Sequence, residues 1–293
     1  MKISYYPGCT LKTNAKNFED STLCSLSRLG LEVKELARWN CCGTVYSLAT
    51  DDLIHHIAPV RNLIFSKDSQ ADALMTLCAM CYNTLKRANE RVKKNPEDLE
   101  KINRFMDAEG LAPYHGDVKV LHLLELLRDE IKFENVAKKV VKPLTNLQVA
   151  CYYGCLLVRP KEIGLDDVEN PQVLENLMTA LGAKSVDFPH KTECCASYQT
   201  VDNPDIVAER TNQILTSARK RGADIVAVSC PLCAFNLDHR QKETANIYSD
   251  FKKIPVVYFT QLLGIALGCP EGALRFDLHF IDPKPILKQK GLL

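Results

Sequence analysis

The sequence predicts an α/β protein made of two similar halves, each built on a short parallel sheet. Three observations lead to this prediction: the composition is globular, strand-like and helix-like segments alternate, and the cysteines occur as a repeat. Hydrophobic residues make up 46% and charged residues 25% of the 293 residues. This composition excludes a disordered chain, and the formal charge of +1 excludes a nucleic-acid binder that works by bulk positive charge.

In the first half, short apolar runs alternate with segments of helical periodicity. The charged stretch 90–101, interrupted at Asn95-Pro96, is typical of a solvated helix pair. Because strands joined through helices pair in parallel, their carboxyl ends should lie at one edge of the sheet. We expect strands at 2–6, 31–36, 73–77 and 118–121, and further helices at 14–29, 51–66 and 123–131.

The second half repeats this order of segments. The polar stretch 138–146, which contains a proline, suits a boundary between the halves. We therefore predict two domains, 1–143 and 144–293. In the second domain we expect strands at 147–153, 183–188, 224–229 and 255–259, and helices at 172–181, 204–220 and 261–267.

Thirteen cysteines are unusual for a chain of this length. The N-terminus has no apolar core of a secretion signal, and no stretch approaches about 18 apolar residues, so we expect a cytoplasmic protein without a membrane span. Thiols stay reduced in the cytosol. Clustered cysteines therefore favour metal binding or redox chemistry over a disulfide scaffold.

Ten of the cysteines occupy equivalent places in the two halves. Each half has a single cysteine, then an adjacent pair, then a Cys-x-x-Cys motif, and Tyr-Tyr-Pro-Gly before Cys9 matches Tyr-Tyr-Gly before Cys155. The remaining three, Cys24, Cys151 and Cys269, are expected to be packing residues. The first set is Cys9, Cys41, Cys42, Cys78 and Cys81, and the second is Cys155, Cys194, Cys195, Cys230 and Cys233.

Five thiolates per set exceed the four that hold a structural zinc ion or an ordinary cubane cluster. This excess favours an iron-sulfur cluster of unusual type. Structural zinc and catalytic dithiols remain as alternatives, since Cys-x-x-Cys beside alternating strands and helices is also typical of thioredoxin-like exchange. Adjacent ligands require a sharp bend, for which Gly43 follows the first pair, whereas Ala196 follows the second.

Each half thus has a single Cys, a Cys-Cys pair and a Cys-x-x-Cys motif, with glycine after the first pair and alanine after the second. This arrangement resembles the duplicated cysteine-rich (CCG) domains of the heterodisulfide reductase B subunit from methanogenic archaea and relatives, whose motif has glycine at the position of Ala196. The resemblance covers nearly the whole length. It implies that each set of five cysteines holds a noncubane [4Fe-4S] cluster. It further implies an enzyme that reduces the disulfide of coenzyme M and coenzyme B, or a related disulfide, to two thiols.

The same resemblance implies partners and an anionic substrate. The partners would be the iron-sulfur C subunit and the flavin-bearing A subunit of heterodisulfide reductase, in a larger complex with a hydrogenase or formate dehydrogenase. An anionic substrate would need fixed cations, and the candidates are Lys12, just after Cys9, and Arg159 and Lys161, just after Cys155. His190 is a candidate proton donor. The alternatives are ordinary surface charges and a loop histidine.

A second function remains open, because such double domains also occur in iron-sulfur subunits of respiratory complexes that transfer electrons without disulfide chemistry. The chain lacks the run of four closely spaced cysteines that binds relay cubanes. With either function, its electrons must therefore come from another protein of the complex.

Overall fold

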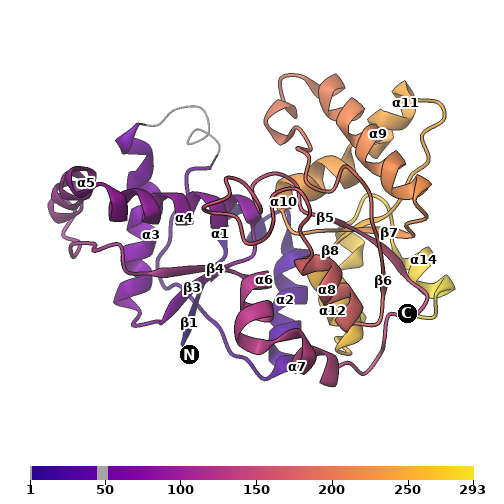
Figure 1. Ribbon diagram of the computed structural model, residues 1–293, viewed down its shortest axis with the longest axis horizontal. Helices are drawn as coiled ribbons and strands as arrows, with labels where there is room; N and C mark the ends of the chain where they lie inside the picture. The colour runs from indigo at the N-terminus through magenta and orange to yellow at the C-terminus, as the bar shows by residue number, and fades with distance from the viewer. Residues whose placement is uncertain (1, 45–51) are drawn as a thin grey trace.

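Two four-stranded sheets, both entirely parallel, form the framework of the molecule (Figure 1). The computed structural model describes residues 2–44 and 52–293. The strand order is β2-β1-β3-β4 in the first sheet and β6-β5-β7-β8 in the second, so corresponding strands occupy corresponding places. The predicted duplication of an α/β unit is confirmed.

The first half holds the strands of the first sheet and the helices between them. Its strands are β1 (Ile3–Tyr6), β2 (Lys34–Glu35), β3 (Ala73–Thr76) and β4 (Lys119–His122). Its α-helices are α1 (Gly8–Leu11), α2 (Lys16–Leu29), α3 (Ile57–Asp68), α4 (Ala79–Lys94), α5 (Pro96–Ala108), α6 (Leu123–Glu125) and α7 (Phe133–Lys138), with a 3-10 turn at Leu53–His56 and a π-helical turn at Leu126–Ile131.

The second half follows the same order from residue 148 onward. Its strands are β5 (Gln148–Tyr152), β6 (Lys184–Val186), β7 (Ile225–Val228) and β8 (Val256–Tyr258). Its α-helices are α8 (Val173–Ala180), α9 (Pro204–Lys220), α10 (Pro231–Ala234), α11 (Gln241–Ile247), α12 (Phe259–Ala266), α13 (Glu271–Leu274) and α14 (Lys284–Gln289), with 3-10 turns at Ser197–Gln199 and Phe276–Leu278 and a π-helical turn at Phe235–His239.

The central strands β1, β3 and β7 are buried along their whole length, and β5 is buried except at Gln148, as expected for parallel strands covered by helices on both faces. The helix α9 has the predicted bounds, because Pro204 suits a first helical position. The break between α4 and α5 is also confirmed, since the Asn95 side chain accepts a hydrogen bond from the Asp98 amide at the start of α5.

Several boundaries differ from the sequence predictions. The edge strands β2 and β6 are shorter than predicted, since an edge strand is paired on one side only. The helix α4 starts at Ala79, well before the predicted residue 90, because its Cys-x-x-Cys segment is itself helical. The helix predicted at 51–66 corresponds to α3, and its predicted start at Asp51 lies outside the described residues. The helices between 231 and 247 were not predicted from the sequence.

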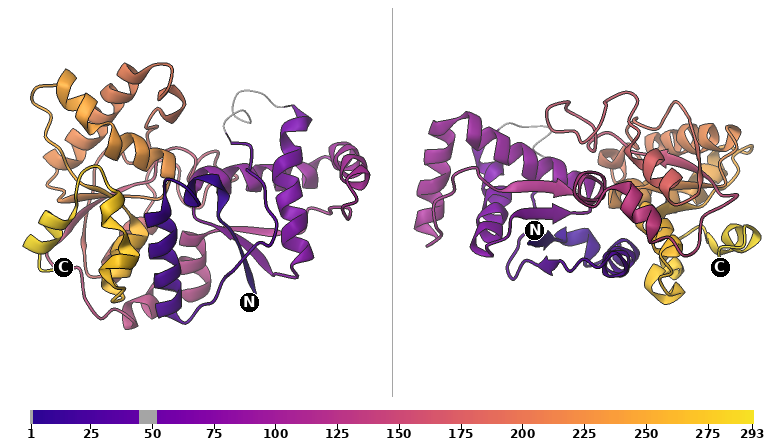
Figure 2. Two further views of the ribbon diagram at one scale, coloured as in Figure 1. Left: turned by 180° about the vertical axis from the view of Figure 1, so that it is seen from behind. Right: turned by 60° about the horizontal axis from the view of Figure 1, so that its bottom comes forward.

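The two halves are joined along the helix α2. This helix packs against α12 of the other half, and the two lie side by side in Figure 1 and in the left view of Figure 2. Phe18 stacks on Tyr258 with ring centroids 4.2 Å apart, and the Ser21 and Thr260 hydroxyls are 2.7 Å apart. Buried side chains from both halves form one continuous core.

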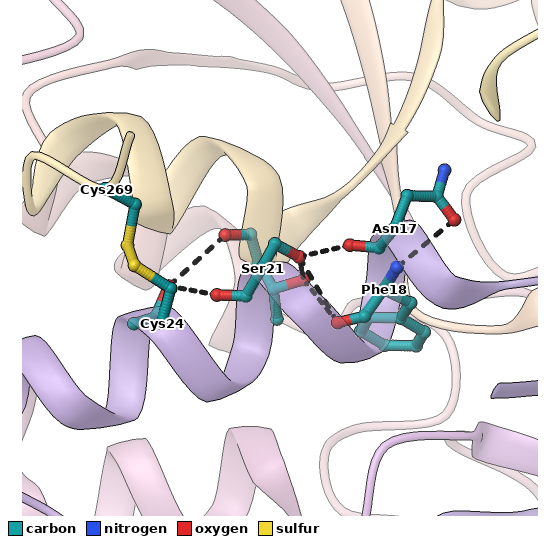
Figure 3. The surroundings of a disulfide bond; sticks show 7 residues. Asn17, Phe18, Ser21, Cys24 and Cys269 are labelled. Carbon is teal, nitrogen blue, oxygen red and sulfur yellow. Dashed lines mark hydrogen bonds between the residues drawn. A yellow bond between two sulfur atoms is a disulfide. The ribbon is translucent and has the colours of Figure 1, made fainter. Parts of the chain in front are cut away.

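A disulfide also crosses this seam. Cys24 of α2 is bonded to Cys269, which follows α12, and the two residues are 245 positions apart in sequence (Figure 3). The prediction that these two cysteines are reduced packing residues is therefore wrong, because the fold brings distant segments into bonding distance. Cys151 is a buried free cysteine, as predicted. Within the described part of the chain, no helix combines the length and apolar character needed to cross a bilayer.

Candidate functional site

The ten repeated cysteines lie at the carboxyl ends of the strands. Cys9 is in α1, directly after β1, and Cys78 precedes α4, directly after β3. Cys155 and Cys230 follow β5 and β7 in the same way. Parallel strands place all their carboxyl ends at one edge, so each sheet gathers its own five cysteines there.

Within each set, the cysteine side chains contact one another in an unbroken series. In the first set, the Sγ atoms of Cys9 and Cys41 are 3.9 Å apart and those of Cys42 and Cys81 are 3.6 Å apart. In the second, those of Cys195 and Cys233 are 3.5 Å apart. The remaining links are the interacting pairs Cys41–Cys42, Cys78–Cys81, Cys155–Cys194, Cys194–Cys195 and Cys230–Cys233.

The two sets also meet. The Cys78 thiol of the first half interacts with the Cys230 thiol of the second, and this is the largest influence on the pKa of Cys78. The ten sulfurs therefore form one series that runs from Cys9 to Cys155 through the seam between the halves. In both sets the first two cysteines are exposed or half-buried, and the other three are buried.

Ionising all five thiols of a set would require a positive charge at its centre. A hydrogen bond from Cys41, followed by one from Cys81, lowers the pKa of Cys42. The thiolate of Cys42, followed by Cys78 and by burial, raises the pKa of Cys81. Buried thiolates repel one another, so all five can ionise together only around cations. Among the described residues, no three His, Cys, Asp or Glu side chains are grouped as ligands of a single metal ion.

These residues fit an iron-sulfur cluster in their donor type and in the space around them. All ten side chains are thiols, the donors that iron-sulfur clusters use. Gly8 and Gly154, with φ of +71° and +66°, precede Cys9 and Cys155. A Cβ atom at Gly8 would lie 3.0 Å from Cys81 Sγ, and one at Gly154 would lie 3.2 Å from Cys233 Sγ. Glycine therefore lets the Cys-x-x-Cys sulfurs come close to the backbone.

Two tyrosines hold the loops that carry the adjacent cysteines. The Tyr6 hydroxyl donates to the Asn40 carbonyl at 2.9 Å, and the Tyr152 hydroxyl donates to the Glu193 carbonyl at 2.6 Å. Each carbonyl belongs to the residue just before a cysteine pair. Both tyrosines are buried. Their role as loop anchors was missed, although the repeated Tyr-Tyr motif was its signal.

The bend after each cysteine pair is left-handed in both halves. Gly43 has φ +78° and Ala196 has φ +60°. The Ala196 amide donates to Cys194 Sγ at 3.3 Å, which favours this bend in spite of the alanine side chain. The second half thus makes its turn without glycine, as the sequence requires.

The three basic side chains predicted to bind an anionic substrate differ in the partners that surround them. Lys12 Nζ lies 2.7 Å from Glu19 Oε1 and 2.6 Å from Glu35 Oε2, so two carboxylates neutralise it. Arg159 donates to the Thr192 carbonyl at 2.8 Å and to Glu169 at 2.9 Å, which ties its loop down. Lys161 lies on an acidic surface loop with Asp166, Asp167 and Glu169. These contacts assign structural partners to Lys12 and Arg159.

The candidate proton donor His190 is half-buried, and its Nδ1 atom is buried without a hydrogen-bond partner among the described residues. It lies just before the buried residues Lys191 and Thr192 of the loop that leads to Cys194. Lys191 pairs with Glu175 at 3.2 Å. The described contacts do not bring His190 to a cysteine, and its proton-donor role stays a prediction.

One difference between the halves shapes the surroundings of the two sets. The helix α2 starts at Lys16, seven residues after Cys9, whereas α8 starts at Val173, eighteen residues after Cys155. The longer loop lies against α4. There the side-chain amide of Asn83 donates hydrogen bonds to the Leu156 carbonyl at 2.9 Å and to the Arg159 carbonyl at 2.7 Å. The corresponding position beside Cys9 in the first half is open and forms a pocket of about 630 Å³.

Comparisons with known proteins agree with the duplication. The family model described as "CCG: Cysteine-rich domain" matches residues 3–86 and again 149–238. The chain is 33% identical to the 8-methylmenaquinol:fumarate reductase membrane anchor subunit of Wolinella succinogenes, over 96% of this chain and 97% of that protein. It is 32% identical to the B subunit of the ferredoxin:CoB-CoM heterodisulfide reductase of Methanosarcina mazei, over 96% of this chain and 94% of that protein.

A solved structure shares the fold. A hypothetical protein from Helicobacter pylori superimposes with a TM-score of 0.76 at 16% identity, and the match covers 95% of this chain and 51% of that chain. This chain therefore corresponds to about half of the Helicobacter protein.

Proposed function

Since this chain belongs to the CCG cysteine-rich family, together with proteins named as the B subunit of heterodisulfide reductases, we propose that it is the catalytic subunit of a disulfide reductase. Its substrate would be the coenzyme M–coenzyme B disulfide or a related disulfide. The observation that supports this most is the placement of two sets of five cysteines at the carboxyl ends of the two sheets, with Sγ contacts inside each set and an interaction between the sets at Cys78 and Cys230.

Each set of five cysteines would hold one noncubane [4Fe-4S] cluster. When bound, the two clusters would supply electrons one at a time. Cleavage of a disulfide consumes two electrons and two protons and releases two thiols. Two adjoining one-electron centres match this requirement, which a single centre would not.

The chain's own residues divide the remaining work. The buried cysteines, of which Cys42 and Cys195 are examples, keep water from the inner side of each set. Tyr6 and Tyr152 hold the loops of the cysteine pairs in place through the carbonyls described above. Cys9 and Cys41 are exposed and provide the open side of the first set.

The proposal includes the partners that the family implies. Electrons would reach this chain from an iron-sulfur C subunit and a flavin-bearing A subunit, in a complex with a hydrogenase or formate dehydrogenase. The lack of a four-cysteine relay motif in this sequence supports the need for such a donor.

A second candidate is electron transfer without disulfide chemistry. It is favoured by the 33% identity to a component of a fumarate reductase whose name includes 8-methylmenaquinol. In that case the two sets would pass electrons between a quinol and a partner protein.

The content of metal and acid-labile sulfide tests the cofactor proposal. We expect about eight iron and about eight sulfide per chain in anaerobically purified protein, because two four-iron clusters require them. Zinc without sulfide would select the structural-zinc alternative and contradict the proposal.

Single-turnover oxidation separates the two functions. Holoprotein is photoreduced with a sacrificial electron donor, separated from that donor, and mixed either with 4,4′-dithiodipyridine or with a water-soluble menaquinone analogue. Disulfide reductase activity predicts about two equivalents of 4-thiopyridone per chain beyond the amount that unreduced holoprotein releases, because one disulfide takes both electrons whereas exchange with free cysteines occurs in either state. Oxidation by the quinone with no thiol release would favour electron transfer.

A further inference from the structure

The pocket beside Cys9 lies between the two halves. Residues of α1 and of the start of α2 line one side, and residues of α10, the following π-helical turn and the C-terminal segment line the other. Its main side chains are Cys9, Leu232, Phe235, His239, Leu278 and Phe280. Its volume of about 630 Å³ is that of a small-molecule site.

The equivalent position in the other half is closed. Phe235 and Asn83 correspond, since each lies two residues after the second cysteine of its Cys-x-x-Cys motif. Asn83 is buried and holds the loop at 156–159, whereas Phe235 is 38% exposed at the pocket. A ligand can thus approach next to Cys9, while the loop covers the same approach next to Cys155.

The wall formed by α10, the π-helical turn and the C-terminal segment is rich in aromatic and apolar side chains, whereas threonines and asparagines line the side of α1 and α2. The Phe235 and His239 rings stack with centroids 4.8 Å apart, and Phe280 meets His239 edge-on at 3.8 Å. Phe280 is 63% exposed and Leu278 is 38% exposed, so apolar side chains face an open cavity. Contiguous exposed apolar surface of this kind is typical of a binding site.

The described lining contains no lysine or arginine. Its acidic residue is Asp238, whose carboxylate accepts hydrogen bonds from the Phe280 amide at 2.9 Å and the Ile281 amide at 3.0 Å. The lining also contains His239 and His279, and His279 Nδ1 lies 3.4 Å from Asp238 Oδ2. With both histidines neutral, an anionic ligand would lose water without gaining a counter-charge, and the Asp238 carboxylate would disfavour it. An uncharged ligand would avoid both costs.

The wall formed by the C-terminal segment is held in place before any ligand binds. Asp238 anchors its backbone, and His279 lies 3.1 Å from the Asn17 amide nitrogen and within 3.0 Å of the Gln261 side chain. Such a preformed wall loses little conformational freedom when a ligand enters.

We propose that this pocket binds one arm of the disulfide substrate, and that this arm is uncharged with an aromatic or apolar body. The inference rests on the disulfide reduction proposed above. It assigns Phe280 and Phe235 as specificity-determining residues. Of the two substrates proposed above, it selects a related disulfide with one uncharged arm over one whose arms are both anionic.

Two thioethers that cannot be reduced or exchanged test the proposal by isothermal titration calorimetry on oxidised holoprotein. The uncharged probe is 4,4′-thiodipyridine, and its dianionic counterpart is 4,4′-thiodibenzoate. We expect the uncharged probe to bind at least about tenfold more tightly, because of the missing counter-charge. Phe280→Ala should weaken it about tenfold. Phe105→Ala removes an exposed phenylalanine on α5 and should have no effect.

A third variant reverses the preference. Leu278→Lys places a cation at the pocket and should bring the dianion to equal or tighter binding. Tighter binding of the dianion by the unaltered protein, no binding of either probe, or an unchanged affinity in Phe280→Ala would overturn the proposal. If the uncharged thioether binds as expected but photoreduced holoprotein releases no more 4-thiopyridone than unreduced holoprotein does, the site stands as a binding site and disulfide reduction fails.

Discussion

At the level of single residues, the site depends on pairs that occur once in each half. Tyr6 and Tyr152 hold the loops before the cysteine pairs, and Gly8 and Gly154 make room for the Cys-x-x-Cys sulfurs. Neither role is visible in residue type alone. Both recur at equivalent positions of the two halves, so the repeat was the signal in the sequence from which they could have been inferred.

Removing one buried cysteine should disturb one set only. Cys42→Ala takes a ligand from the first set, so iron should fall by about half, from about eight to about four per chain. Cys151→Ala removes a buried cysteine outside both sets and should leave the iron content unchanged. Iron and sulfide analysis with electron paramagnetic resonance measures both. Loss of all iron in Cys42→Ala would mean that the sets do not assemble separately.

Lys12 is predicted to act on stability rather than on substrate binding. Burial favours a higher pKa for Glu19, but hydrogen bonds from Lys12 and Lys16 outweigh it and lower that pKa. The stabilisation from Glu19 is therefore present at neutral pH and is lost as the pH falls through its lowered pKa. Lys12→Met should cost about 1–2 kcal/mol at pH 7, because it leaves a buried carboxylate with fewer partners.

Urea unfolding of the holoprotein measures this effect, and the difference from wild type should shrink in acid as Glu19 takes up a proton. Lys161→Met, on the surface loop, is the control and should change little. A weaker affinity for disulfide in Lys12→Met, with unchanged stability, would instead support the substrate role that the sequence predicts.

At the level of elements, the turns after the cysteine pairs offer a reciprocal test. Gly43 and Ala196 both have positive φ, and an alanine has a steric cost there that glycine does not. We expect Ala196→Gly to stabilise the protein by about 0.5–1 kcal/mol and Gly43→Ala to destabilise it by about 1–2 kcal/mol. Chemical unfolding of both variants checks the signs. Destabilisation by Ala196→Gly would show that the turn tolerates alanine without strain.

The loop that follows Cys155 is the element that makes the two halves unequal. Its additional residues reach α4, where the Asn83 amide donates hydrogen bonds to two of its carbonyls, and the position beside Cys9 stays open. The unequal spacing of the cysteines in the two halves was the visible sign of this loop. Which crevice it would close could not be read from the spacing.

For the whole molecule, the seam between the halves combines packing of α2 on α12 with the Cys24–Cys269 disulfide. A crosslink across 245 residues strongly restricts the unfolded chain. We expect its removal to cost about 4–5 kcal/mol. Cys24→Ser, Cys269→Ser and the double variant should be equally destabilised in thermal unfolding, because each breaks the same bond. Alkylation and mass spectrometry that found both thiols free in purified protein would contradict the bond.

Much of the framework could be predicted because it depends on local patterns. Buried strands such as β3 and β7 are short apolar runs, and α9 starts at a proline. The short edge strands and the helices after Cys230 were not predicted well, since their extent depends on which neighbours cover them.

The sequence alone determined the duplication, the parallel order within each half and the grouping of ten cysteines into two sets, because the spacing of residues along strands and turns dictates these features. Only the tertiary structure decided how the halves face each other. It joined Cys78 to Cys230, paired Cys24 with Cys269, neutralised Lys12 and left a pocket open beside Cys9. These features depend on contacts between segments far apart in the chain, and no local pattern records which distant segments will pack together.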